Sequence, residues 1–171
     1  MEFEYDLTRL ANEAFSDRGN KYFAAHDYAK YYSFLFAAFR KDSFSMLDLG
    51  LCRGGKDVEP LLTRVATAAP SASMWLKYFP YAFMYGFDIS DFHSVKMDRF
   101  QFIRGDIGSL SDLKHLRSTL KPLRIIIDDA SHAAYHQQLA FIKLFSLLES
   151  GGIYVIEDVH SWSPIEHELP E

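Results

Sequence analysis

The sequence predicts an α/β fold in which a doubly wound, mainly parallel sheet carries helices on both faces. Two observations predict it: five short apolar runs alternate with helix-length segments along the 171 residues, and most of these runs end in an acidic residue. Strands and helices that alternate at this spacing are typical of parallel sheets, because parallel neighbours need a long crossover connection. A chain of this length suits one hydrophobic core, so we expect a single domain overall.

The first part of the chain, residues 1–40, is predicted to be a helical segment. The stretch LTRLANEAF favours one helix, and SDRGNK after it favours a turn at Gly19. Residues 26–40 then place one apolar stripe at spacings of three, four and seven, which is typical of an amphipathic helix. The stripe consists of Tyr28, Tyr32, Leu35, Phe36 and Phe39.

The remaining residues, 41–171, contain the predicted strands. These are SFSMLDLG, YAFMYGFDIS, RFQFIRGD, PLRIIIDDASH and GGIYVIEDVHS. Consecutive isoleucines in the fourth run suit a strand that is covered on both faces.

Helical segments are predicted between these strands in ASMWLKYF, LSDLKHLRSTL and AAYHQQLAFIKLFSLLES. In the last segment we expect the buried face to consist of Leu139, Ile142, Phe145 and Leu148. Gly151 and Gly152 are expected to end that helix. Residues 56–73 fit poorly, and we interpret them as an insertion over the glycine loop, either a lid or a surface excursion.

Charge and composition narrow the classes of function. A net charge of -5 and a pI near 5.8, without a concentrated Lys/Arg surface, argue against nucleic acid as a partner. The acidic start and the lack of long apolar runs predict neither a signal peptide nor a membrane span, hence a cytoplasmic protein. The single cysteine, Cys52, excludes an internal disulfide and a multi-cysteine zinc site. Fifteen Phe and ten Tyr predict a bulky core or a buried contact within a homo-oligomer.

Acidic residues follow the predicted strands, and the carboxyl ends of parallel strands meet at one edge of a sheet. The acids are Asp48, Asp88, Asp106, Asp128, Asp129, Glu157 and Asp158. Carboxylates packed together raise one another's pKa unless cations, hydrogen-bond donors or hydroxyl groups compensate them. We therefore expect the ligand site at this edge.

The loop after the first strand, DLGLCRGG, has the pattern D-x-G-x-x-x-G, with Asp48, Gly50 and Gly54 at its fixed positions. It is not the dinucleotide fingerprint G-x-G-x-x-G. Its spacing leaves room for a nucleoside and an amino-acid tail, and Asp88 after the second strand could accept both ribose hydroxyls. The alternative is a tight strand-to-helix turn with a solvated carboxylate.

The fourth and fifth strands, if they are neighbours, bring Asp129 beside Glu157 and Asp158. Three carboxylates with space for water are the ligands that magnesium or a similar divalent ion prefers. His132, three residues after Asp129, could stand at the rim as a general base.

A simpler alternative is that Asp128 or Asp129 only caps a helix that starts near Ser131. The other histidines have no comparable setting, and we treat them as surface or structural residues, His26 among them. Of these, His160 is expected to border the site.

These motifs resemble the class I S-adenosylmethionine-dependent methyltransferases. The similarity is greatest to the magnesium-dependent sugar O-methyltransferases of macrolide biosynthesis, of the macrocin and mycinamicin type, with the cephalosporin hydroxylase group alongside. It rests on D-x-G-x-x-x-G, IIDDASH, GGIYVIEDVH and the lead-in DRGNKYFAAHDYAKYY, and runs from about Asp17 to Trp162. The resemblance implies a Rossmann-like domain over residues 41–171. It also implies that S-adenosyl-L-methionine and Mg²⁺ are used to methylate a hydroxyl of a sugar or natural-product metabolite.

The resemblance also implies individual roles. The metal-binding acids correspond to Asp129, Glu157 and Asp158, and the general base to His132. The cofactor-binding residues correspond to Asp48, Gly50, Gly54, Asp88 as the ribose-binding acid and Asp106 beside the adenine, and we count Asp128 with them.

One departure from this pattern concerns the end of the chain. It stops at Glu171, soon after the fifth strand, whereas this fold usually adds an antiparallel hairpin of two more strands. The open alternatives are a fragment, a partner chain that covers the edge, and a non-catalytic or partner-dependent module. A metal-dependent reaction other than methyl transfer is also open.

Overall fold

The computed structural model of the chain describes residues 6–21, 25–51, 66 and 68–159. Five strands form one parallel sheet in the order β3-β2-β1-β4-β5. They are β1 (Ser45–Leu49), β2 (Phe83–Asp88), β3 (Phe100–Arg104), β4 (Leu123–Asp128) and β5 (Leu148–Ile156). The predicted doubly wound, Rossmann-like α/β fold is confirmed, and each predicted strand is present.

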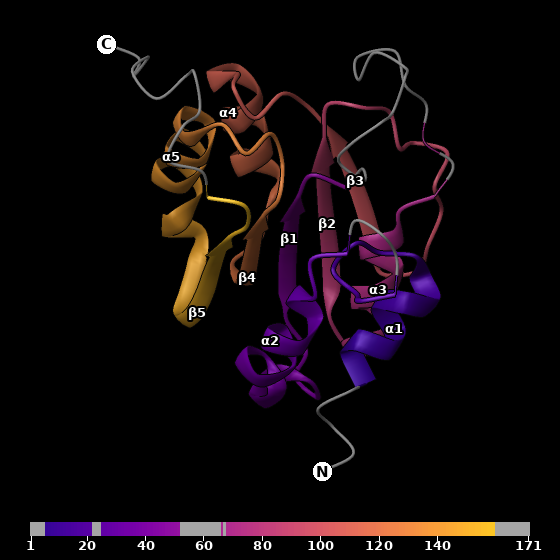
Figure 1. Cartoon of the computed structure of the whole chain (residues 1–171). Helices are drawn as coiled ribbons and strands as arrows, with labels where there is room; N and C mark the ends of the chain where they lie inside the picture. Colours follow the sequence, from indigo (N-terminus) through magenta and orange to yellow (C-terminus); the bar gives the residue numbers. More distant parts are fainter. Residues whose placement is uncertain (1–5, 22–24, 52–65, 67, 160–171) are drawn as a thin grey trace.

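Helices cover both faces of the sheet (Figure 1). One face carries α1 (Asp6–Ala14), α2 (Tyr28–Leu35) and α3 (Pro70–Tyr78), and the other carries α4 (Leu110–Thr119) and α5 (Ala134–Leu144). Two short 3₁₀ helices, η1 (Ala37–Phe39) and η2 (Phe145–Leu147), follow α2 and α5. Because side chains alternate along a strand, Leu47 and Ile126 pack under α4 and α5, whereas Met46 and Ile125 pack under α1, α2 and α3.

The predicted stripe of α2 is correct at Tyr32 and Phe36, which are buried, and wrong at Leu35, which is 44% exposed. The buried face instead combines these two residues with Ala29 and Ser33. Two small residues let the helix approach the core closely, so the apolar pattern alone placed the face incorrectly.

The predicted buried face of α5 is correct only at Leu139. Ile142 and Phe145 are 69% and 51% exposed, and the helix ends at Leu144. The reason is that Gln137 is buried instead, where its amide donates to the main-chain oxygen of Glu157 at 3.0 Å.

Leu148 and the two glycines expected to end that helix lie within β5. Gly151 has a φ of +77° there, close to a register shift between β4 and β5. The two glycines therefore belong to an irregular part of a strand. In the sequence this looks the same as a helix that ends at glycine, so the prediction was wrong.

The predicted insertion at 56–73 lies largely outside the described residues, but its end is helical. Residues 70–73 form the first turn of α3, with Pro70 at its start. The prediction was wrong here because proline is tolerated in the first helical turn, where its missing N–H has no partner anyway. No helix in the described ranges has the length and hydrophobicity needed to span a bilayer.

Candidate active site

The acidic residues meet at the carboxyl edge of the sheet because β1, β4 and β5 are parallel neighbours. The Asp129 amide donates to the Leu49 oxygen at 2.9 Å, and the Glu157 amide donates to the Asp128 oxygen at 2.8 Å. These bonds extend the ladder one residue past the strands. They confirm that the fourth and fifth predicted strands are neighbours.

Gly50 lies where the loop after β1 crosses the ends of β2 and β4. Its amide donates to the Phe87 oxygen at 2.9 Å, and its φ is +87°. A Cβ atom at this position would lie 2.1 Å from the main-chain oxygen of Asp129. Only glycine fits this conformation and this contact. Gly54, the second glycine predicted for the loop, lies outside the described residues, as do Cys52 and His160.

At the ends of β2 and β3, the acids accept hydrogen bonds from the main chain. Asp88 accepts from the Leu51 amide at 2.8 Å and the Ser90 amide at 2.7 Å, and it is 7% exposed. Asp106 accepts from the Gly108 amide at 2.8 Å. A carboxylate oxygen can accept more than one hydrogen bond, so these two acceptors can still receive hydrogen bonds from an adenosine group beside the Gly50 loop.

Arg18 is the main site residue that the sequence did not identify. It is 1% exposed, and its side chain lies among three carboxylates. Nε donates to Glu157 Oε1 at 2.7 Å, and Nη2 donates to Asp129 Oδ2 at 2.9 Å and to Asp48 Oδ1 at 3.1 Å. Burial alone would lower the pKa of Arg18, but these carboxylates raise it above its ordinary value. An isolated arginine in a turn carries no sequence signal of such burial.

Asp48 is fully enclosed with Arg18. Burial raises the pKa of its carboxyl to about 6; Glu157 adds to the shift and Arg18 opposes it. The contact of Asp48 with a cofactor stays a prediction.

Asp128, the last residue of β4, closes the turn that follows the strand. Its Oδ1 accepts from the Ala130 amide at 3.4 Å, and burial raises its pKa to about 7. The alternative that Asp128 or Asp129 caps the next helix is wrong. The N-cap of α5 is Ala133, which has no side-chain capping bond.

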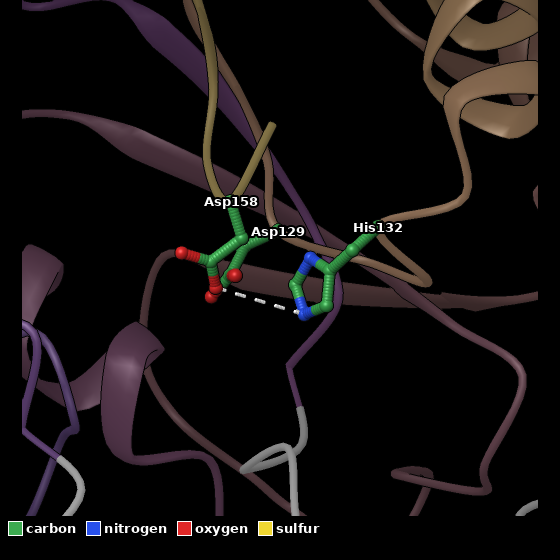
Figure 2. A group of neighbouring side chains, drawn as sticks. All are labelled: Asp129, His132 and Asp158. Carbon is green, nitrogen blue, oxygen red and sulfur yellow. Dashed lines mark ion pairs between the residues drawn. The ribbon is translucent and has the colours of Figure 1, made fainter. Parts of the chain in front are cut away.

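We call Asp48, Asp129, Glu157 and Asp158 the acid cluster. At its outer side, away from Arg18, the side chains of Asp129, His132 and Asp158 point toward one another. Figure 2 shows these three side chains. Each offers one ligand atom, and these atoms all lie within 4.8 Å of one another. The pair of His132 Nε2 and Asp158 Oδ2 is separated by 3.8 Å. Both residues have positive φ angles, 58° and 49°. Such backbone conformations cluster at functional sites.

Glu157 is not in this converging group but lies behind it. Its Oε1 accepts from Arg18 and from the Tyr32 hydroxyl at 2.6 Å, and it is 4% exposed. The structure thus brings Asp129, Asp158 and His132 together and places Glu157 behind them, where Arg18 binds both Glu157 and Asp129.

The N-terminal segment supplies partners for these acids. The Tyr28 hydroxyl donates to Asp158 Oδ1 at 2.5 Å, and His26 Nδ1 lies 3.3 Å from the same oxygen. Burial opposes the shift, but the hydrogen bond from Tyr28 and the nearby His26 and His132 lower the pKa of Asp158. The side chain of His26 is 40% exposed, as predicted for a surface residue, but its contact with Asp158 places it at the edge of the candidate site. The H-x-Y spacing of the lead-in was the signal that pointed to it.

The donor set of the outer group fits a divalent ion. Carboxylate oxygens from two chain segments and one imidazole face one another, and Glu157 adds a third carboxylate nearby. Burial raises the pKa of Asp129 well above its ordinary value; Glu157 adds to the shift and Arg18 opposes it.

Comparisons with known proteins find related methyltransferases. The chain is 33% identical over 156 residues to the 8-demethyl-8-alpha-L-rhamnosyl tetracenomycin-C 2'-O-methyltransferase of Streptomyces olivaceus. It is 31% identical over 154 residues to the mycinamicin VI 2''-O-methyltransferase of Micromonospora griseorubida. These alignments cover 91% and 90% of this chain but only 39% and 36% of the relatives, so the chain spans less than two fifths of their length. No protein-family model matches the chain.

Solved structures of the MycE methyltransferase from the mycinamycin pathway are also similar. One is a complex with Mg and SAH, and another also contains mycinamycin VI; both have a TM-score of 0.75 and 30% identity. They are matched over 90% of this chain and over 37% and 39% of the MycE chain. The predicted resemblance to magnesium-dependent sugar O-methyltransferases is confirmed.

Proposed function

Because the chain is related to the sugar O-methyltransferases and shares their Rossmann-like fold, we propose that it acts in S-adenosylmethionine-dependent methylation of a sugar hydroxyl on a natural product. One observation supports this proposal most directly. Asp129, His132 and Asp158 converge at the strand ends that adjoin the Gly50 loop. Acids beside a nucleoside-binding loop are the arrangement that a metal-dependent transfer to a hydroxyl requires.

The cofactor is proposed to lie across the ends of β1, β2 and β3. S-adenosylmethionine would supply the activated methyl group there. There Asp88 would accept the ribose hydroxyls, Asp106 would lie on the adenine side, and the turn at Gly50 would let the main chain after β1 run beside the ligand. The cofactor roles of Asp48, Gly54 and Asp128 stay predictions.

The metal is proposed to be held by Asp129, Glu157 and Asp158. Mg²⁺ would polarise a hydroxyl of the acceptor and favour its ionisation. His132 removes the hydroxyl proton, and the nearby Asp158 carboxylate stabilises the imidazolium that forms.

A second assignment of the ligands is also favoured by a specific observation. The converging atoms belong to Asp129, His132 and Asp158, while Glu157 is held by Arg18 and Tyr32. His132 would then bind the ion, and Glu157 would act from behind the ligands. The two assignments differ in whether His132 is needed for metal binding.

The acceptor is proposed to be a sugar-containing small molecule, since the named relatives act on rhamnosyl tetracenomycin and mycinamicin VI. Neither nucleic acid nor a membrane is proposed as a partner, and a homo-oligomer stays a prediction.

Calorimetry of the full chain with S-adenosylhomocysteine tests the cofactor half of the proposal. We expect saturable binding to the wild type and at least about tenfold weaker binding to Asp88→Asn, because the amide replaces a charged acceptor. Asp91→Asn, which alters a half-buried carboxylate paired with His93 in the turn after β2, serves as the control and should bind normally. Absence of binding to the wild type, with and without Mg²⁺, would contradict the proposal.

Methyl transfer from labelled cofactor to rhamnose-containing acceptors tests the chemical half. His132→Gln should keep cofactor binding and lose about 10²–10⁴-fold in rate, the usual contribution of a general base. The exposed residue His115 on α4 offers a matched control, His115→Gln, with unchanged rate. If His132→Gln also loses Mn²⁺ binding, His132 is a metal ligand and the second assignment holds.

A further inference from the structure

Arg18 joins the ends of three strands with one side chain. Asp48 belongs to β1, Asp129 follows β4, and Glu157 follows β5. The guanidinium is planar and donates in fixed directions, so bonds to several carboxylates fix their relative orientation as well as their charge.

Two of the three proposed metal ligands are bound by Arg18 at a single oxygen each, Asp129 at Oδ2 and Glu157 at Oε1. A hydrogen bond to one oxygen sets the rotation of the carboxylate and thereby the direction of its other oxygen. Partners of this kind orient metal ligands, and their loss commonly reduces metal affinity.

The backbone of Arg18 is itself held in place. Its amide donates to Ser16 Oγ at 3.3 Å, and its carbonyl accepts from the Ala29 amide at 2.8 Å. Helix α2 begins at this point and brings Tyr32 to Glu157. The guanidinium is therefore positioned by the fold and does not depend on the acids alone.

The inner side of the cluster has no room for a hydrated ion. The cavity beside Arg18, which is lined also by Gly50 and Asp129, has a volume of about 10 Å³. One water needs about this much space, so among the described residues the space beside Arg18 favours approach of a hydrated ion from the side where Asp158 and His132 lie.

We propose that Arg18 is a positioning residue for the metal site, which fills the inner side of the acid cluster and holds Asp129 and Glu157 in the orientation that receives the ion. The inference rests on the proposed function, because it requires a metal at this site. It adds that the N-terminal segment, through Arg18, controls metal affinity.

Titration of the full chain with Mn²⁺, followed by electron paramagnetic resonance, tests this role without requiring catalysis. Arg18→Met should bind Mn²⁺ about 10–100-fold more weakly than the wild type. Arg18→Lys keeps the positive charge but loses the planar guanidinium. Its Mn²⁺ affinity should therefore lie between those of the wild type and Arg18→Met, about 3–10-fold below the wild type.

Arg99 provides the matched control. It donates to the main-chain oxygens of Leu76, Phe79 and Ala82, and none of these belongs to the acid cluster. Arg99→Met should lower the thermal unfolding temperature yet keep the wild-type Mn²⁺ affinity, so it separates destabilisation from loss of ligand orientation.

Wild-type or tighter Mn²⁺ binding by folded Arg18→Met would overturn the inference. Tighter binding would mean that the positive charge of Arg18 only competes with Mn²⁺ for the carboxylates. If Arg18→Met does not fold, Arg18→Lys decides, and wild-type affinity in that variant overturns the inference. Absence of Mn²⁺ binding to the wild type would overturn the metal part of the proposed function together with this role. Equal affinities of wild type and variants would overturn this role alone.

Discussion

The two halves of the carboxyl edge satisfy their acids in different ways. At the ends of β2 and β3, Asp88 and Asp106 accept hydrogen bonds from main-chain amides of the adjoining loops. At the ends of β1, β4 and β5, side chains of the N-terminal segment, chiefly Arg18, bind Asp48, Asp129, Glu157 and Asp158, and only Asp128 accepts from a main-chain amide among the described contacts. The first half is stabilised locally, whereas the second depends on tertiary packing.

This difference has an energetic consequence. A carboxylate bound by main-chain amides can be changed with little effect elsewhere, because its loop retains its own structure. A buried network of charges is coupled, and removing one member leaves the others uncompensated. Substitutions in the β1, β4 and β5 half should therefore have the larger effects.

The largest effect is expected from Arg18→Met. It leaves three buried carboxylates without their cation and should lower the free energy of unfolding by about 3–5 kcal/mol. Denaturant unfolding in the presence of a chelator measures it. Arg9→Met, which breaks an exposed ion pair with Glu13, is the control and should change stability by less than about 0.5 kcal/mol. Similar losses in both variants would contradict the contrast between buried and exposed pairs.

Gly50→Ala tests the contact that joins the two halves. The added methyl group would meet the Asp129 oxygen in a left-handed backbone conformation, so we expect a loss of about 2–4 kcal/mol. Gly151→Ala has a similar φ but no atom within 4 Å of the added Cβ, and should cost only about 1–2 kcal/mol. Thermal unfolding of both variants separates the steric clash from the cost of the left-handed backbone. Equal losses of stability in the two variants would show that the clash with Asp129 contributes nothing.

The pH dependence of stability should depend on Asp128. Its folded pKa of about 7 lies above its unfolded value of 3.8, so the folded state holds the proton more tightly. The free energy of unfolding should therefore fall as the pH rises from about 4 through 7, by about 3–4 kcal/mol from this residue. Asp128→Asn resembles the protonated acid and should flatten this slope. Chelator-treated samples in a pH series measure it, and an unchanged slope would disprove the assignment.

The smallest effects are expected at the end of β3. Asp106→Ala removes an acceptor for one main-chain amide and should lower stability by about 1 kcal/mol. Asp106→Asn keeps an acceptor oxygen and should change it by less than about 0.5 kcal/mol. Denaturant midpoints compare the two variants, and a loss as large as that of Arg18→Met would show that this half is coupled as well.

Local features of the sequence predicted most of the fold. Alternating apolar runs identified the five strands, and the acids after them identified the edge where Asp129 and Glu157 meet. The buried face of α5 could not be predicted from the apolar pattern, because Gln137 is buried and Ile142 is exposed. Burial of a polar residue depends on a partner in another element, here the main chain of Glu157.

The sequence by itself determined the order of the elements and the position of Gly50 and the strand-end acids, since periodicity and turn chemistry are local properties. Only the tertiary structure decided which cation meets these acids. Arg18 is separated from Asp48, Asp129 and Glu157 by 30, 111 and 139 residues. No local pattern distinguishes an arginine that will be buried among carboxylates from one that remains in solvent. That distinction arises when α2 packs against the sheet and brings the preceding turn over the strand ends.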